Sequence, residues 1–461
     1  MSVLARVKLY DESIIKQSKR MFSNYDLRIL MIPIIIEQLL NSFMGMADTI
    51  MVSNVGNAAI SAVSLVDSIN NFVIQVFYAL SAGAAIICSQ YLGKKDEKGA
   101  NKAAHQVILS VTVISLVVTV FCLIFRAPLL HLVFGDVASD VMKNSMSYFF
   151  ITVLSYPFLA LFDSGGALFR ASGNSKFPMM VALLCNGLHI IVNAVLIFVF
   201  HMGVEGAAIS TLFSRILSTI IVFVALYKGK QVIKMKNAFS LRLDMPVIFR
   251  ILAIGVPAGI ENGMFQFGKL AIQSTVSTLG TIAIAAQAMT IILEMLSGMV
   301  GMGIGIGLMT VVGQCMGAGR KEEAKFYMVK LSIVAEIGVF VSCILVLLFT
   351  KPILLIAGMH GESAKLCINM MMWITLVKPL VWVLAFVPAY GLRAAGDVKF
   401  SMTVSTLSMW FCRVALCIFL IRIMHFGPIA VWIGMFADWF IRGLIFAYRF
   451  VTGKWSKMRV L

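Results

Sequence analysis

The stretch Ile29–Met51, ILMIPIIIEQLLNSFMGMADTIM, is an apolar run that contains two carboxylates. At about 1.5 Å per helical residue, it is long enough to cross a hydrocarbon core of roughly 30 Å. One helical face holds four of its side chains at the spacing i, i+4, i+7, i+11: Glu37, Asn41, Met44 and Asp48. Carboxylates in a bilayer are costly and normally face a protein cavity, a cation or a proton. The stretch therefore predicts a spanning helix whose acidic stripe is either functional or satisfied by neighbouring helices.

The rest of the chain is similarly apolar. Of its 461 residues, 60% are hydrophobic and 13% are charged, and the mean hydropathy is +0.95. Because the apolar runs are continuous rather than alternating, they indicate an all-α, multi-pass membrane protein. The eight cysteines form no CxxC or Cys/His cluster, so we expect no cofactor and no transition-metal site.

Twelve spans can be drawn: 29–52, 59–91, 102–125, 141–169, 177–200, 204–227, 247–272, 281–316, 324–350, 364–392, 400–424 and 428–450. They divide the chain into a cytoplasmic amino tail, a first lobe of six spans, a cytoplasmic linker, a second lobe of six spans and a cytoplasmic carboxyl tail: 1–28, 29–227, 228–246, 247–450 and 451–461.

Positive charge predicts the orientation. Of 38 lysines and arginines, 28 lie in the termini and in alternate loops, whereas the opposite loops hold five. By the positive-inside rule, both termini are cytoplasmic and the protein lies in the plasma (inner) membrane. The same sorting explains the net charge of +17 without nucleic acid. Within the linker, VIKMKNAFSLRL (232–243) suits either a short helix on the inner leaflet or a solvated basic segment.

The two halves of the chain are related by an internal repeat. A shift of 224 residues superposes Pro33–Ala100 on Pro257–Ala324 without a gap, with 16 identities in 68 positions. A shift of 223 pairs FRASGNSKFPM (169–179) with LRAAGDVKFSM (392–402). Copies six spans apart have the same orientation, so the sequence predicts two pseudo-symmetric six-helix lobes around a central cleft. The glycine-rich run Gly298–Gly307 lets the eighth span flex or approach its neighbours closely.

Several motifs resemble those of the multidrug and toxic compound extrusion (MATE) family: GMADTIMVSNVG (45–56), SQYLG (89–93), RASGNSKFPM (170–179) and RAAGD (393–397). The resemblance covers about residues 25–450. It implies twelve helices in two lobes, and multidrug efflux by antiport with protons or sodium ions.

The resemblance also implies site residues. Asp48 matches the family's essential first-helix aspartate. His189 and Asn193 occupy the fifth-span positions where many members have Asn and then Asp or Asn, and Thr211 matches a sixth-span threonine. The two second-lobe acids of the NorM-like branch are missing, since this chain has Phe265 and Val381 there. In its ion-site residues the chain is thus closer to DinF-like than to NorM-like members.

In the fifth span, Asn186, His189 and Asn193 share one helical face. If the first, fifth and sixth spans pack together, these side chains converge with Asp48 and Thr211 in the outer half of the first lobe. Such a group could carry a proton, or its oxygens could coordinate sodium at Asp48. The alternatives are a core histidine bonded to backbone at His189 and a helix-to-helix hydrogen bond at Asn193.

The acidic stripe also suggests where substrate binds. Glu37 and Glu261 occupy matched positions nearer the inner side, and with Asn41 and Met44 they could form an entry for cationic substrates. Alternatively, the two glutamates pair with basic neighbours. The intramembrane Lys269 and Lys378 are expected to pair with acids of the second lobe: Glu294, Glu336 or Glu261.

We therefore expect a cation-coupled antiporter that exports bulky, cationic organic compounds by alternating access. A lipid-linked saccharide flippase of the same wider superfamily is the alternative, although its cavity would be expected to be cationic. The chain shows no metalloprotease motif and no Ser/His dyad, so enzymatic activity is not expected. The expected partners are organic cations and the lipid bilayer, and no oligomer is required.

Overall fold

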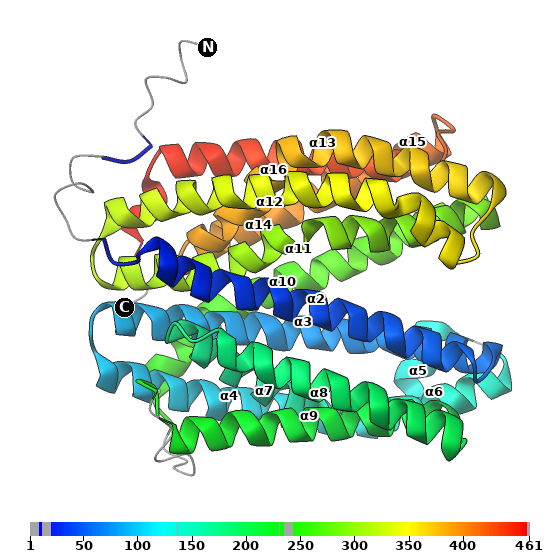
Figure 1. Ribbon diagram of the computed structural model, residues 1–461, viewed down its shortest axis with the longest axis horizontal. Coiled ribbons are helices and arrows are strands. Elements are labelled where there is room, and N and C mark those ends of the chain that lie inside the picture. The colour runs from blue at the N-terminus through cyan, green and yellow to red at the C-terminus, as the bar shows by residue number, and fades with distance from the viewer. Residues whose placement is uncertain (1–8, 12–19, 136, 230, 235–242, 459–461) are drawn as a thin grey trace. The chain divides into compact units, whose positions relative to one another are not determined.

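The computed structural model describes residues 9–11, 20–135, 137–229, 231–234 and 243–458, and every regular element in these ranges is a helix (Figure 1). Within these ranges, eleven helices are long and apolar enough to cross a membrane, and one bent pair of helices makes a twelfth span. The prediction of an all-α protein with twelve spans is therefore confirmed. The chain forms two compact units, an amino-terminal unit of Arg28–Gly259 and a carboxyl-terminal unit of Met1–Leu27 with Ile260–Leu461.

The helices of the amino-terminal unit are α2 (Asn24–Ser53), α3 (Asn57–Gly93), α4 (Glu97–Ile124), α5 (Arg126–Phe134), α6 (Ser139–Leu154), α7 (Tyr156–Ala171), α8 (Lys176–Ala194), the π-helix η2 (Val195–Val199), α9 (Gly203–Lys228) and the first part of α10 (Met245–Val276). Within this unit, α3 packs against α4, α6 and α7, and α8 packs against α9.

The carboxyl-terminal unit contains the rest of α10, η3 (Ser277–Leu279), α11 (Thr281–Gly317), α12 (Lys321–Ile356), α13 (Gly361–Ala394), α14 (Val398–Ser408), the π-helix η4 (Met409–Ala415), α15 (Leu416–Arg422), α16 (Ile429–Val451) and η5 (Lys454–Lys457). Met21 and Phe22, which precede α2, also belong to this unit, because the Met21 amide donates to Glu323 and the Phe22 amide to the Tyr327 hydroxyl.

The fourth span, predicted at 141–169, is not one continuous helix. Helices α6 and α7 meet at an angle of 43°, and Ser155 lies between them. Pro157 lies in the first turn of α7, where its missing N–H costs no helical bond. The short helix α5 lies between the third and fourth spans and was not predicted.

The division between the two units falls inside α10 and not in the predicted linker. The first part of α10 packs closely against α3 of the same unit, since a Cβ built on Gly83 of α3 would lie 3.2 Å from the Gly255 amide nitrogen. Asp244 precedes α10 and accepts a hydrogen bond from the Val247 amide at 3.2 Å. An ion pair with Lys102, together with that bond, holds the pKa of Asp244 below its usual value. Residues 235–242, most of the predicted amphipathic segment, lie outside the described residues.

The glycine-rich run of α11 lets α13 approach closely, as predicted. A Cβ on Gly301 would lie 2.5 Å from the Trp382 ring, and a Cβ on Gly305 would lie 2.4 Å from the Tyr390 ring. Neither contact is sterically possible, so the two aromatic rings occupy space that only glycine leaves free.

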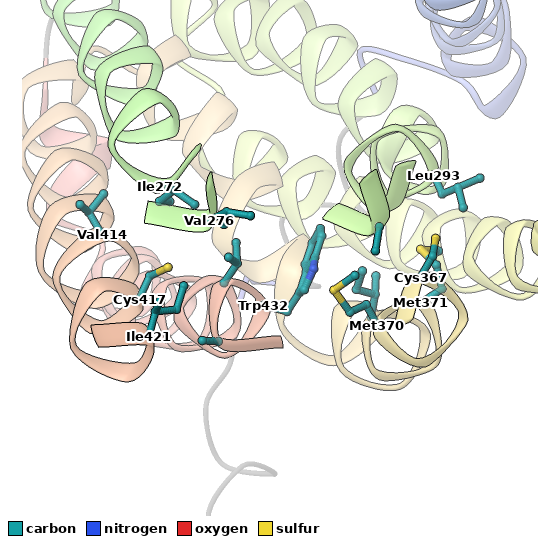
Figure 2. Close-up of a cluster of buried hydrophobic side chains, with 14 of the residues drawn as sticks. Ile272, Val276, Leu293, Cys367, Met370, Met371, Val414, Cys417, Ile421 and Trp432 are labelled. Atoms are coloured by element: carbon teal, nitrogen blue, oxygen red, sulfur yellow. The ribbon is translucent and has the colours of Figure 1, made fainter. Parts of the chain in front are cut away.

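A cluster of apolar side chains fills the interior of the carboxyl-terminal unit (Figure 2). Trp432 of α16 is fully buried, and in Figure 2 it lies between Val276 of α10 and Met370 of α13. Its indole N–H donates to Gln287 of α11 at 3.1 Å, so the ring is held by a polar contact as well as by packing. Ile272, which the internal repeat pairs with Asp48 (48 + 224 = 272), belongs to this cluster.

Candidate ion site in the amino-terminal unit

The first feature of the site is a carboxylate held by two side chains of α8. Asp48 lies five residues before the end of α2. Its Oδ1 atom lies 2.7 Å from His189 Nε2 and accepts a hydrogen bond from Asn193 Nδ2 at 2.9 Å. His189 and Asn193 lie one turn apart on α8, so a single helical face presents both groups to Asp48. The structure thus brings together three of the predicted coupling residues.

A second layer supports the imidazole. Ser210 of α9 places its hydroxyl oxygen 3.2 Å from His189 Nδ1 and 3.1 Å from the Ala207 carbonyl oxygen. The hydroxyl can therefore donate to a neutral Nδ1, or it can rotate to donate to Ala207 and accept from a protonated Nδ1. Sequence reasoning did not identify Ser210; its only signal was its place beside Thr211 on the sixth span.

Two oxygen atoms at the site lack hydrogen-bond partners among the described residues. Asp48 Oδ2 makes no hydrogen bond, and the Asp48 side chain is 29% exposed. Asn193 is fully buried, yet its Oδ1 atom has no donor. An accessible carboxylate oxygen and a buried amide oxygen without a donor are the groups that a proton or a hard cation satisfies.

Two other predicted coupling residues, Asn186 and Thr211, bond to partners other than Asp48. Asn186 donates to Asn41 Oδ1 at 3.3 Å and so joins α8 to α2 at a second point. The Thr211 hydroxyl donates to the Ala207 carbonyl of its own helix at 3.0 Å and makes no hydrogen bond to Asp48. Met44 is half-buried.

Behind this site lies a second polar network that sequence reasoning missed. Asp67 of α3 accepts from Asn70 at 3.2 Å and from the Tyr148 hydroxyl at 3.3 Å. The Tyr156 hydroxyl donates to Asn70 at 2.7 Å, while Arg215 of α9 donates to Ser155 at 2.6 Å. Asp48 and Arg215 both act electrostatically on Asp67, so charge at Asp48 is felt in this network.

The two predicted substrate glutamates form equivalent ion pairs. Glu37 accepts from Arg170 Nη1 at 3.1 and 3.2 Å in the amino-terminal unit. Glu261 accepts from Arg393 Nη2 at 2.6 Å in the carboxyl-terminal unit. The internal repeat relates the members of the two pairs, so each unit carries its own copy. This pairing is the alternative that the sequence left open; a role of Glu37, Asn41, Met44 and Glu261 in substrate binding remains a prediction.

Of the two intramembrane lysines, one has the predicted partner. Lys378 is fully buried and pairs with Glu294, and it also donates to the Glu294 carbonyl at 2.7 Å and to Ser297 at 2.9 Å. Lys269 of α10 is exposed and has no ion pair or hydrogen bond among the described residues. For Lys269 the prediction was therefore wrong.

Comparison with known proteins gives a family. The family model MatE matches residues 33–195 and 257–419, so each match covers one copy of the internal repeat. The chain is 27% identical over 432 residues to the uncharacterized transporter YisQ of Bacillus subtilis, covering 92% of this chain and 93% of that protein. It is 25% identical over 450 residues to the probable multidrug resistance protein NorM of Thermotoga maritima, covering 94% and 93%.

A solved structure agrees in fold. The crystal structure of MATE in complex with MaD3S superposes with a TM-score of 0.86 at 17% identity, covering 93% of this chain and 96% of that chain. At that identity the likeness establishes the arrangement of helices and no more.

Proposed function

Because the chain belongs to the MatE family, whose members are transporters and not enzymes, we propose that it is a proton-coupled antiporter exporting bulky organic compounds by alternating access. In this proposal it lies in the plasma membrane with both termini cytoplasmic, it works without an obligatory oligomer, and its substrates are cationic. The observation that supports proton coupling best is the chain Asp48–His189–Ser210, in which each group can change its protonation or its hydrogen-bond direction.

The cycle begins with a proton from outside. With Asp48 ionised, a neutral His189 donates from Nε2 and accepts from Ser210 at Nδ1. When the pair takes up a proton, Nδ1–H donates to Ser210, whose hydroxyl turns to the Ala207 carbonyl. The imidazole therefore keeps both hydrogen bonds in either state. Loading thus requires no rupture of the α8–α9 contact.

Coupling requires that proton and substrate bind the two transport states differently. The ionised pair favours the inward-facing state, which loads a cationic substrate. The added proton neutralises the net negative charge of the Asp48–His189 pair, and so weakens its electrostatic effect on Asp67. This change favours a rearranged first lobe that releases substrate outward. We also propose that the chain is closer to DinF-like than to NorM-like members in its ion-site residues. Phe265 and Val381 stand where NorM-like members have acids, so the proposed coupling site lies in the first lobe alone.

Sodium is the second candidate for the coupling ion. Asp48 Oδ2 and the buried Asn193 Oδ1 are oxygen ligands without donors among the described residues, and sodium prefers such oxygens. A lipid-linked saccharide flippase is not favoured, since the Asp48 carboxylate at this site would repel pyrophosphate.

The proposal is tested with purified protein in liposomes that contain an entrapped fluorescent organic cation, ethidium. We expect an imposed pH gradient to drive ethidium movement, and an equal sodium gradient at constant pH to leave it at the level of protein-free liposomes. Movement driven by sodium alone would replace the proton by sodium. Movement driven by neither gradient would contradict coupled antiport.

Ser210 and Thr211 are neighbours on α9 and provide a matched pair of variants. Ser210→Ala removes the partner of His189 Nδ1, so we expect about a tenfold loss of pH-driven transport, corresponding to one hydrogen bond of about 1.4 kcal/mol, together with a shifted pH profile. Thr211→Ala removes a hydroxyl bonded to its own helix, and we expect transport within about twofold of wild type, an effect below 0.5 kcal/mol. The measurement is the initial rate of ethidium movement as a function of pH. Equal losses in both variants would contradict the assignment of Ser210.

A further inference from the structure

Two arginines, one aspartate and one serine form a buried cluster in the carboxyl-terminal unit, which we call the Asp438 cluster (Asp438, Arg442, Arg413 and Ser408). Asp438 of α16 accepts from Arg442 Nη2 at 2.7 and 2.9 Å and lies 2.8 Å from Arg413 Nη2. Ser408 donates to the same carboxylate. Arg413 is 5% exposed, Arg442 is 1% exposed and Asp438 is fully buried. The cluster holds two cationic groups against one anionic group.

Hydrogen-bond donors exceed acceptors in this region. Both oxygens of Asp438 are occupied by the bonds just described. Arg413 Nε and Arg442 Nε are nevertheless buried without an acceptor among the described residues, and so is the indole nitrogen of the neighbouring Trp439. Buried donors in proteins normally have acceptors. All three unpaired atoms are N–H donors, and two of them belong to cationic side chains.

A third cationic side chain, that of Lys269, lies near the Asp438 cluster. The ring of Phe265 on α10 lies 5.7 Å from the Arg413 guanidinium carbon and 4.9 Å from that of Arg442. Lys269 follows Phe265 by one turn, is exposed, has no ion pair among the described residues and interacts electrostatically with Arg413 and Glu294. An exposed lysine within a membrane span is costly unless it faces water or an anionic partner.

The acids of this unit do not balance these charges. Glu294 interacts with Lys269 but is already paired with Lys378. Three other acids of this unit have other partners. Glu261 pairs with Arg393, Asp397 pairs with Arg449, and Glu336 interacts electrostatically with Cys343, near the Lys378–Glu294 pair. Arg413 and Arg442 therefore share the carboxylate of Asp438, while the acid that interacts with both Lys269 and Arg413 is Glu294, which is already paired with Lys378.

The internal repeat shows that this charge is specific to the second half. Lys269 corresponds to Gly45 and Ile272 to Asp48 (45 + 224 = 269; 48 + 224 = 272). Where the amino-terminal unit has an acid, the carboxyl-terminal unit thus has an apolar residue with a lysine one turn away. Ile272 and Val276 lie next to each other on α10 in the apolar cluster of Figure 2, to which Val414 also belongs.

We propose that Lys269, Arg413 and Arg442 form a binding site for the anionic group, carboxylate or phosphate, of an amphiphilic organic molecule. The guanidinium groups offer the planar donors that such anions prefer, and Lys269 adds an accessible point charge. Ile272, Val276 and Val414 offer an apolar wall to the rest of the molecule. The proposal deepens the proposed function, on which it rests for the idea that the bound molecule is cargo. According to this proposal, some of the exported molecules carry an anionic group.

The test measures binding without a gradient, so it does not depend on coupling. Purified full-length protein in phosphatidylcholine nanodiscs is titrated into carboxyfluorescein, an anionic dye, and separately into ethidium, with fluorescence anisotropy as the readout. We expect Lys269→Gln to raise the Kd for carboxyfluorescein about tenfold, the loss of one charge-assisted contact. The matched control Lys269→Arg should keep the wild-type Kd, and ethidium binding should be equal in all three proteins.

A lipid headgroup is the other source of the same chemistry, and nanodiscs with anionic phosphatidylglycerol separate the two. Competition by phosphatidylglycerol in wild type, and its loss in Lys269→Gln, would support the site with a headgroup as its occupant. Arg413→Lys, which keeps the charge but not the planar donors, should also weaken carboxyfluorescein binding. No binding of the dye to wild type, or equal binding by wild type, Lys269→Gln and Arg413→Lys, would show that the cluster is structural only. Failure of ethidium transport under both the pH gradient and the sodium gradient would overturn the proposed function and leave these binding results standing.

Discussion

Replacement of Asp48 by Asn is expected to reduce pH-driven export of ethidium to the level of protein-free liposomes. Asparagine has nearly the shape of aspartate, and its side-chain oxygen can still accept from His189 and Asn193. It cannot bind a proton at neutral pH, however. A proton gradient can drive transport only if the proton binds one transport state more tightly than the other. A variant that binds no proton at this site cannot be driven in this way, however well it binds substrate. The measurement is ethidium movement in liposomes with an imposed pH gradient.

Asp140→Asn provides the matched control, because it makes the same chemical change at an exposed acid in the first turn of α6. We expect wild-type transport from this variant. Ethidium binding in the absence of a gradient should survive in Asp48→Asn, which separates loss of coupling from loss of folding. If Asp48→Asn transports as fast as wild type under a pH gradient, the proton is not carried at Asp48.

The spans and the centre of the site could be predicted because both follow from local patterns. An apolar run long enough to cross a membrane needs no tertiary information. Asp48 stands out because a carboxylate in such a run needs a reason. His189 and Asn193 follow from their common helical face, and the structure brings both to the same carboxylate oxygen.

The remaining site features depend on which helices pack together, and a single sequence does not show this. Ser210 supports His189, rather than Thr211, because of the rotation of α9 against α8, and one residue of rotation moves a side chain by about 100°. The bend at Ser155 was not predicted either, since an apolar run has the same sequence pattern whether its helix is straight or bent. Arg413 lies in one apolar run, and Asp438 and Arg442 lie one turn apart in the next; only packing brings the two runs into one cluster.

The same cluster leads to the largest expected effect on stability. Asp438→Asn removes the carboxylate that pairs with both Arg413 and Arg442, and leaves two buried guanidinium groups without an ion-pair partner among the described residues. Removing one partner of a buried ion pair typically costs about 3–5 kcal/mol. We expect the apparent unfolding temperature in detergent, followed by the fluorescence of a thiol-reactive dye at the buried cysteines, to fall by several degrees. An unfolding temperature equal to that of wild type would show that the arginines do not need Asp438.

The double variant Asp438→Asn/Arg413→Gln distinguishes charge repulsion from lost packing. It removes one acid and one base, so its cluster carries the same net charge of +1 as the wild-type cluster of two arginines and one aspartate. If repulsion dominates, the double variant should recover part of the stability lost in the single variant, and the coupling energy in the double-mutant cycle should be roughly 1–3 kcal/mol. A bound anion should act in the same direction, because it supplies the missing negative charge. Carboxyfluorescein should then raise the unfolding temperature of Asp438→Asn more than that of wild type, by the linkage between binding and stability. Equal shifts in both proteins would place the dye away from the arginines.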